Sequence, residues 1–321
     1  MADLSRRSAI ALGLAAGAAP FVQPHAARAQ NLPALRVAYQ PYAYSAQVLY
    51  ARDMGFFTKA GLSVSLQEIA FGAALATAVA SGAVDVGIAT ITTLSIAHSK
   101  KIPFVIIAPG AEYSSSRPTA GGLYVGNQTG IKTGKDMNGK VVGTPGLATM
   151  GEYGVRVWVD ANGGDSTTLK FVELPFSQMP AAFAAGRIDA AFIGEPFLDE
   201  ANKVAHMMAR EMDAIGAEYV ITAWFTTLPW AQAHPDLVAR FAASMREASA
   251  WAGAPQNTSK CVDIIAKQFK IDPKTITPSA LSFFPQQITP GLIAAEVTMT
   301  AKYGKFPAFP PEELIYTPPR G

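Results

Sequence analysis

Apolar residues in the first part of the chain alternate between short runs and helical spacing, a pattern typical of an α/β fold. The predicted elements are strand 35–39, helix 45–54, strand 61–66, helix 73–80 and strand 84–89. Gly55 and Gly82 are expected to end the two helices, because glycine readily adopts the left-handed conformation found after a helix. This alternation with short connections favours a mostly parallel sheet that is covered by helices on both faces.

The same order of elements is predicted a second time, about 104 residues further along the chain. The second set comprises strand 140–143, helix 149–162, strand 169–174, helix 179–185 and strand 188–193. Three short segments also match in order: Arg36-Val-Ala-Tyr-Gln-Pro41 with Lys140-Val-Val-Gly-Thr-Pro145, Glu68-Ile-Ala-Phe71 with Glu173-Leu-Pro-Phe176, and Ala80-Ser-Gly-Ala-Val-Asp85 with Ala184-Ala-Gly-Arg-Ile-Asp189. A repeated supersecondary unit explains these matches most simply. Two such halves that face each other make a cleft, where small molecules bind.

The chain is expected to cross between the two units twice, through the β-rich segments 119–125 and 218–225. The predicted domains are a signal peptide at 1–29, lobe I at 30–118 and 226–321, and lobe II at 119–225. Further helices are expected after Pro235, at 258–269 and at 290–303, and the Pro-rich residues 306–319 are expected to lie over the surface.

Residues 1–29 have the composition of an export signal. Arg6 and Arg7 precede an apolar stretch, and Ala27-Arg28-Ala29 forms a small-x-small cleavage site. The two arginines resemble a twin-arginine signal, but Ala9-Ile10 stands where that signal usually has Phe-Leu, so Tat and Sec export both stay open. The apolar stretch is shorter than the ~20 residues of a membrane span. The mature chain is therefore expected in the periplasm and not embedded in the membrane.

Charge and cysteine content exclude several classes of protein. The whole chain has 26 Lys and Arg residues and 24 Asp and Glu residues, and removal of residues 1–29 would leave 23 of each. Bulk charge would then attract neither nucleic acid nor anionic lipid. The single cysteine, Cys261, cannot form an internal disulfide and is expected to be a small buried residue of a helix. No His/Cys cluster has zinc-ligand spacing, so neither a metal site nor a cofactor is predicted.

Candidate ligand-binding residues lie mainly in the loops that follow the predicted strands. In open α/β sheets, ligands bind beyond the carboxyl ends of the strands, where helix N-termini expose free N–H groups. These loops are rich in aromatic and hydroxyl side chains and hold one carboxylate. The candidates, together with one aromatic residue of the return crossing, are Tyr42, Tyr44, Ser45, Phe71, Gly72, Thr90, Thr92, Thr144, Gly146, Thr149, Glu195 and Trp224.

Several candidates also have a purely structural interpretation. Thr149 would cap the helix that it precedes, in a capping box with Glu152. Thr90 and Thr92 would satisfy the start of the next helix.

The aromatic candidates carry the same two alternatives. Tyr42 and Tyr44 would either contact the ligand or pack against the neighbouring lobe, and Trp224 would either stack on a flat ligand or lie in the core. Glu195 is favoured for ligand contact, because a carboxylate in a cleft would select an amine, an amidine or an aminopyrimidine.

Sequence patterns of catalysis are missing. The chain contains neither Gly-x-Ser-x-Gly nor His-Glu-x-x-His, and the glycines before Lys135 do not have the spacing of a phosphate loop. The histidines after residue 29, His98, His206 and His234, lie outside the predicted ligand loops. The sequence therefore predicts a binding protein and not an enzyme.

Four motifs occur in order within residues 34–250. They are Gly55-Phe-Phe-Thr-Lys-Ala-Gly-Leu-Ser-Val64, Ala80-Ser-Gly-Ala-Val-Asp-Val-Gly87, Lys135-Asp-Met-Asn-Gly-Lys-Val-Val142 and Ala185-Gly-Arg-Ile-Asp-Ala-Ala-Phe192. They resemble motifs of the periplasmic substrate-binding proteins of the nitrate/sulfonate/taurine and thiamine-precursor import group. The resemblance implies a type II periplasmic binding protein fold, in which two α/β lobes with two crossover strands close on a small-molecule ligand. It further implies a monomer that delivers its ligand to the permease of an ABC importer.

The resemblance leaves the ligand class open. The related sulfonate and taurine binders tend to have Trp-Asp-Pro where this chain has Gly194-Glu195-Pro196, and Glu-Pro-Phe is closer to the pyrimidine-binding members. The first loop, however, has tyrosines where thiamine-precursor proteins often have Trp and His, and the six predicted loops contain no Arg or Lys. A sulfonate- or taurine-like anion and a pyrimidine or other aromatic compound therefore stay alternatives. A pyrimidine-synthesis-type enzyme of the same fold is the alternative function, but the Cys-rich motif of that enzyme is missing here.

Overall fold

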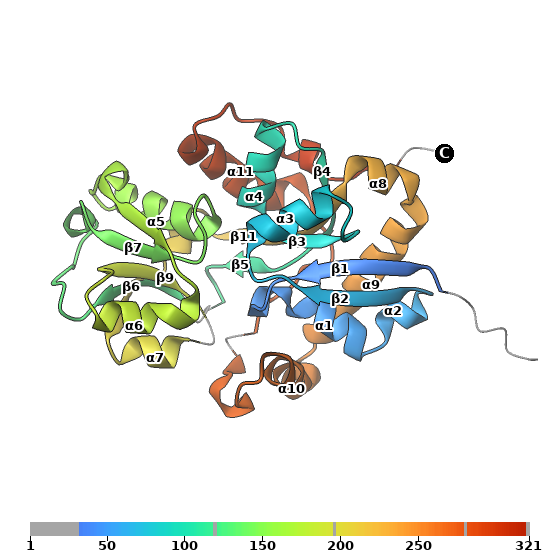
Figure 1. Cartoon of the computed structure of the whole chain (residues 1–321), viewed down its shortest axis with the longest axis horizontal. Coiled ribbons are helices and arrows are strands. Elements are labelled where there is room, and N and C mark those ends of the chain that lie inside the picture. Colours follow the sequence, from blue (N-terminus) through green and yellow to red (C-terminus); the bar gives the residue numbers. More distant parts are fainter. Residues whose placement is uncertain (1–31, 118–120, 195–196, 279–280, 319–321) are drawn as a thin grey trace, which may run out of the picture. The chain divides into compact units, whose positions relative to one another are not determined.

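The computed structural model describes residues 32–117, 121–194, 197–278 and 281–318 (Figure 1). Its strands are β1 (Ala34–Tyr39), β2 (Ser63–Glu68), β3 (Gly87–Thr90), β4 (Phe104–Pro109), β5 (Glu112–Ser114), β6 (Gly122–Gly126), β7 (Val141–Thr144), β8 (Lys170–Glu173), β9 (Ala190–Ile193), β10 (Ala205–Ala209), β11 (Glu218–Val220) and β12 (Thr222–Thr227). Its α-helices are α1 (Ala46–Asp53), α2 (Phe56–Lys59), α3 (Gly72–Ala80), α4 (Ile91–Ser99), α5 (Met150–Ala161), α6 (Met179–Ala184), α7 (Leu198–Asn202), α8 (Leu228–Ala233), α9 (Pro235–Ala252), α10 (Thr258–Phe269) and α11 (Pro290–Gly304).

The first group of strands has the order β2-β1-β3-β12-β4. β1 and β2 pair in parallel, and β12 pairs antiparallel with both β3 and β4. Two backbone hydrogen bonds join β1 to the residue before β3: Ala38 N–H donates to Val86 O at 2.9 Å, and Val86 N–H donates to Arg36 O at 3.1 Å. The mostly parallel arrangement with one antiparallel strand confirms the predicted α/β class.

The second sheet has the order β8-β7-β9-β6-β10, which matches the first group strand for strand. β7 pairs in parallel with β8 and β9, and the fourth strand, β6, is again antiparallel to its neighbours. Figure 1 shows α5 on one face of this sheet and α6 and α7 on the other. The repeat read from the sequence is therefore present in the strand order.

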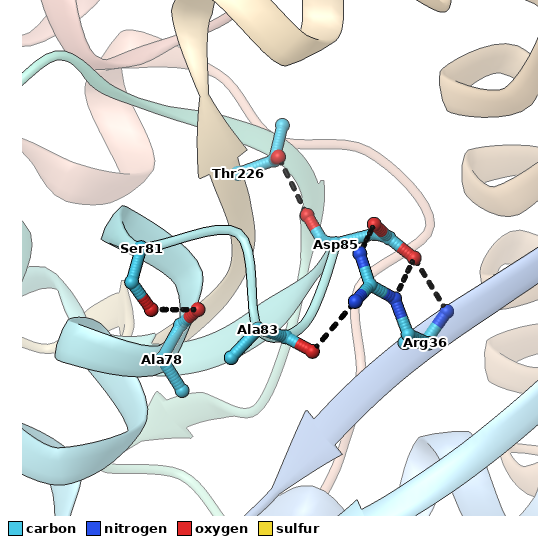
Figure 2. A network of polar contacts seen from close by, with 6 residues as sticks. All are labelled: Arg36, Ala78, Ser81, Ala83, Asp85 and Thr226. Atoms are coloured by element: carbon cyan, nitrogen blue, oxygen red, sulfur yellow. Dashed lines mark hydrogen bonds and ion pairs between the residues drawn. The ribbon is translucent and has the colours of Figure 1, made fainter.

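The aspartate that ends the third repeated segment has the same structural role in both copies. Arg36 N–H donates to Asp85 Oδ2 at 2.7 Å, and Val141 N–H donates to Asp189 Oδ2 at 2.8 Å. In the first copy the Arg36 guanidinium also pairs with the Asp85 carboxylate, and Thr226 Oγ1 donates to Asp85 O at 2.6 Å (Figure 2). Each aspartate thus ties the beginning of the third strand to the first strand of its sheet.

The two connections between the sheets run side by side, because β5 and β11 pair antiparallel. β12 spans residue 225, where the sequence placed the end of lobe II, and it continues in the first group of strands to Thr227. The segment at 119–125 forms β6 inside the second sheet from Gly122 onward, while residues 118–120 lie outside the described residues.

The C-terminal segment does more than cover the surface. Ile315 forms a parallel bridge with Ile106 of β4, and Tyr316 N–H donates to Ile106 O at 2.9 Å. Leu314 is buried in the main hydrophobic core. The expectation that residues 306–319 lie over the surface is therefore wrong for this part of the segment, because an apolar residue and an open strand edge were both available to it.

The main hydrophobic core also contains two residues that the sequence had drawn attention to. Cys261 is buried on α10, as predicted, and burial raises the pKa of its thiol to about 11. Trp224 of β12 is completely buried and packs edge-on against Phe241 of α9.

Within the described part of the chain, no helix has the length and apolarity that a membrane span requires.

Candidate functional site

A cavity of about 340 Å³ lies where loops of the two sheets meet. Its wall comes from the loop after β1, from the first turns of α3, α4 and α5, and from a short 3-10 helix, η4 (Phe176–Gln178). Seven of the twelve predicted site residues line it: Tyr42, Tyr44, Phe71, Gly72, Thr90, Gly146 and Thr149.

The other predicted residues do not line this cavity. Ser45, Thr92 and Thr144 are buried beneath it, and Thr144 Oγ1 donates to Gly146 O at 3.1 Å. Trp224 lies in the core, where its Nε1–H donates to Gln47 Oε1 at 2.7 Å. Glu195 lies outside the described residues.

The start of α5 differs from the predicted capping box. Thr149 Oγ1 donates to Gly146 O at 2.7 Å and so does not cap the helix, and Glu152 Oε2 accepts from Ala148 N–H at 2.8 Å. Ala148 adopts a left-handed conformation with φ of 53°, and the carboxylate of Glu152 therefore meets the N–H of Ala148 instead of that of Thr149. Among the described residues, no acceptor meets the N–H groups of Met150 and Gly151, both of which line the cavity.

The start of α3 is open in the same way. Phe71 occupies its N-cap position and provides no side-chain acceptor. Gly72 and Ala73 line the cavity, and no partner for their N–H groups occurs among the described residues. The Gln40 amide lies beside this turn, where its Nε2–H donates to Ala70 O at 3.2 Å and its Oε1 accepts weakly from Tyr44 OH at 3.5 Å.

The start of α4, in contrast, is fully satisfied. Thr90 Oγ1 accepts from Thr93 N–H at 3.1 Å, and Ile91 N–H donates to Ile221 O at 3.0 Å. Thr92 N–H donates at 3.1 Å to Glu296 Oε2, which comes from α11. Thr90 and Thr92 thus have the structural role that the sequence analysis gave as their alternative, although Thr90 also lines the cavity.

Aromatic rings form much of the cavity wall. Tyr42 lies 5.3 Å from Tyr44 and 5.6 Å from Phe176 between ring centroids, and Phe176 lies 5.7 Å from Phe192. Burial raises the pKa of the Tyr42 phenol and holds that of Tyr44 well above its ordinary value. Both phenols are therefore neutral near pH 7 and available as hydrogen-bond donors.

The sequence analysis did not find several residues of the cavity wall. Phe176 is the second-copy counterpart of the predicted Phe71, so the matched segments already pointed to it, whereas Glu173 corresponds to Glu68, which was not a candidate. Lys100 adds a cation that the six predicted loops lacked, but it follows α4, a helix whose bounds the sequence analysis did not predict. The side chains of Phe71 and Leu147 are both 51% exposed although they are apolar.

Two sheets of matching strand order, two paired connections and a cavity at the strand ends together define the fold of the periplasmic binding proteins. The chain belongs to the NMT1/THI5-like family, whose model matches residues 42–258.

Individual relatives agree with this family. The taurine-binding periplasmic protein of Escherichia coli is 25% identical to the chain over 274 residues, which are 82% of this chain and 78% of the relative. Among solved structures, the periplasmic aliphatic sulphonate binding protein SsuA from Escherichia coli superposes with a TM-score of 0.72 at 18% identity, covering 89% of this chain and 92% of SsuA. The periplasmic nitrate-binding protein NrtA from Synechocystis PCC 6803 gives a TM-score of 0.69 at 16% identity, over 88% and 84% of the two chains.

Proposed function

We propose that this protein is the solute-binding component of an ABC import system and captures a small organic anion by closure of its two lobes. Its relatives by sequence and by fold are named as binding proteins for taurine, aliphatic sulphonate and nitrate. The export signal read from residues 1–29 supports a periplasmic location, and the partner would be the permease of the importer. The names of these relatives and the lack of sequence patterns of catalysis both favour a binding protein over an enzyme of the same fold.

The open starts of α3 and α5 carry this proposal. Both helices begin at one cavity with N–H groups that have no partner among the described residues, and such groups together with the helix dipole stabilise an anion. The cation Lys100 and the carboxylate Glu173 both line the cavity, so the helix starts and not the side-chain charges favour an anion there. A sulfonate or carboxylate group placed between the two helix starts would be held by hydrogen bonds from the backbone.

The remaining wall favours an organic ligand over a bare inorganic ion. Tyr42, Tyr44 and Phe176 provide apolar ring surface, and the exposed Phe71 and Leu147 side chains would lose their contact with water if the lobes closed. Burial of apolar surface contributes about 25 cal/mol per Å², so both the ligand and the closure would gain from such a wall. The pairing of β5 with β11 makes these two connections the expected hinge.

Gly72 offers a direct test, because it is the first residue of α3. Proline is tolerated at this position of a helix, and the preceding Phe71 has an extended conformation that is compatible with a following proline. Gly72→Pro would remove one N–H donor and keep the helix. Gly72→Ala is the matched control, because a Cβ at this position would meet only the Gln40 amide, at 3.7 Å.

The experiment is calorimetric titration of the mature chain and of both variants with taurine, ethanesulfonate, nitrate, benzoate and an aminopyrimidine. We expect Gly72→Pro to weaken anion binding about tenfold relative to Gly72→Ala, since a charged hydrogen bond contributes about 1.5–3 kcal/mol. Equal affinities of the two variants would remove the start of α3 from the site. If the aminopyrimidine bound and no anion did, the proposed ligand class would be wrong.

A further inference from the structure

A second cavity, of about 500 Å³, adjoins the first. Tyr42 and Phe176 line both cavities, which therefore adjoin at these two rings. The second cavity is further lined by Glu68 at the end of β2, by Phe197 before α7, and by the residues at the end of α10. The proposed anion site occupies only the first cavity.

A row of aromatic rings continues from one cavity to the other. Tyr44 lines the first cavity only, and Phe197 lines the second only. Between them, ring centroids are separated by 5.3 Å from Tyr44 to Tyr42, 5.6 Å from Tyr42 to Phe176 and 6.4 Å from Phe176 to Phe197. These spacings lie within the range of interacting rings, so a flat molecule would find ring surface along the whole path.

A carboxylate in the second cavity is held in place by a chain of hydrogen bonds. Arg52 Nη1 donates to Gln268 Oε1 at 3.2 Å, Gln268 Nε2 donates to Tyr39 OH at 2.7 Å, and Tyr39 OH donates to Glu68 Oε2 at 3.1 Å. Burial and the nearby Glu68 charge raise the pKa of Tyr39 to about 12, so the phenol keeps its proton and remains a donor to Glu68. These residues come from four different elements, so one oxygen of the exposed Glu68 carboxylate is oriented before any ligand arrives.

The second cavity also contains a cation, Lys270, which follows α10 and is exposed. Its four-carbon side chain is flexible, and no hydrogen bond or ion pair of its ammonium group occurs within the described residues. A ligand that binds an oriented carboxylate loses less side-chain conformational entropy than a ligand that must first order a mobile ammonium group. Glu68 is therefore the stronger determinant of what the second cavity accepts.

We propose that the preferred ligand is an elongated amphoteric molecule: an anionic head, a flat apolar body and an ammonium group at the far end. The head would lie at the starts of α3 and α5, the body along Tyr42 and Phe176, and the ammonium group at Glu68. This inference rests on the proposed function, because it assigns the second half of the same ligand. An aryl sulfonate or aryl carboxylate with an aminoalkyl substituent in the para position is the corresponding chemical class.

The test compares three sulfonates that differ by one part each: ethanesulfonate, 4-ethylbenzenesulfonate and 4-(2-aminoethyl)benzenesulfonate. Their dissociation constants are measured by calorimetry on the mature chain, on Glu68→Gln and on Glu173→Gln. Glu173 is the matched control, because it is an exposed carboxylate that lines the first cavity only. Benzene-1,4-disulfonate is included to report on Lys270.

We expect affinity to rise about tenfold with the ring and about tenfold again with the amine, each step corresponding to about 1.4 kcal/mol. Glu68→Gln should abolish the second gain and leave the first, whereas Glu173→Gln should keep both. Equal binding of ethanesulfonate and the aminoethyl compound would overturn this inference and leave the proposed function intact. The inference would also be overturned if benzene-1,4-disulfonate, and not the aminoethyl compound, bound more tightly than the sulfonate that has the ring alone. It would likewise be overturned if Glu173→Gln, and not Glu68→Gln, removed the affinity gained with the amine. Failure of all four sulfonates, together with taurine, nitrate and benzoate, would reject the anion ligand of the proposed function itself.

Discussion

Glu211 should make the stability of this fold strongly dependent on pH. It lies in a short 3-10 helix, η5 (Glu211–Ala214), is 0% exposed, and neither of its carboxylate oxygens has a hydrogen-bond partner among the described residues. Burial raises its pKa from 4.5 to about 7, and the nearby Asp213 charge adds to this. The amides of Glu211 and Leu123 and the Arg210 charge oppose the shift, but these amides do not reach hydrogen-bond geometry.

The direction of the effect follows from where the proton is held. The unfolded chain releases the Glu211 proton near pH 4.5, and the folded chain keeps it up to about pH 7. The contribution of protonated Glu211 to the free energy of unfolding is therefore fully present below pH 4.5 and is lost as the pH rises toward 7. A difference of about 2.5 pH units at 1.36 kcal/mol each corresponds to a loss of about 3 kcal/mol.

The assay is urea denaturation of the mature chain and of Glu211→Gln between pH 4 and pH 8. Glutamine has the same shape and does not titrate, so the difference between the two proteins isolates Glu211 from other groups, including Glu112, whose pKa burial also raises to about 7. We expect the free energy of unfolding of Glu211→Gln, relative to that of the parent, to rise by about 3 kcal/mol between pH 4 and pH 8. The exposed Glu200→Gln serves as control and should show a nearly constant difference. A constant difference for Glu211→Gln would refute the reasoning.

Two further predictions rest on single contacts, and a third concerns the carboxylate that the sequence placed in the cleft. Trp224→Phe should lower the free energy of unfolding by about 1–3 kcal/mol in urea denaturation, because Gln47 Oε1 loses its buried donor, and should leave ligand affinity unchanged. Asp85→Ala should destabilise the fold more than Asp189→Ala in the same assay, because within the described residues Asp85, unlike Asp189, also pairs with a guanidinium. The sequence makes Glu195 the rival of Glu68 for an amine: if Glu195→Gln weakened an amine-bearing ligand about tenfold in calorimetry and Glu68→Gln did not, Glu195 would be the partner of the amine, and an unchanged dissociation constant would exclude Glu195.

Much of the fold could be predicted because its signals are local. The predicted helix at 258–269 coincides with α10, and α11 begins at Pro290 as expected, because proline and the apolar spacing mark their limits. The matching strand order of the two sheets agrees with the repeat. The bounds of α4 were not predicted, although a helix start after Thr90 was anticipated, because polar Thr92 and Ser95 lie among its buried residues and the sequence shows no apolar stripe.

The candidate site could be predicted only as far as its loops. The rule that ligands bind at strand ends brought Tyr42, Phe71 and Thr149 to one cavity. The same rule could not tell that Thr92 and Thr144 point inward, because neighbouring residues of one loop face different sides and only packing decides between them. The second cavity could not be predicted from the sequence. Its wall combines Glu68, Phe176 and the end of α10, which are far apart in the chain and meet only in the folded protein.

The difference between α4 and its neighbours depends on a residue far away in the sequence. Three helices begin at strand ends around the same cavity, and the start of α4 alone is closed, in part by Glu296 from α11. Burial holds the pKa of Glu296 well above its ordinary value, because it disfavours the charged form of the carboxyl group. Glu296 occupies the Thr92 N–H, which is therefore not free for a ligand, whereas the first N–H groups of α3 and α5 have no partner among the described residues. Closure of one helix start by Glu296 thus leaves the anion site to the other two, and this arrangement exists only once α11 has packed on α4.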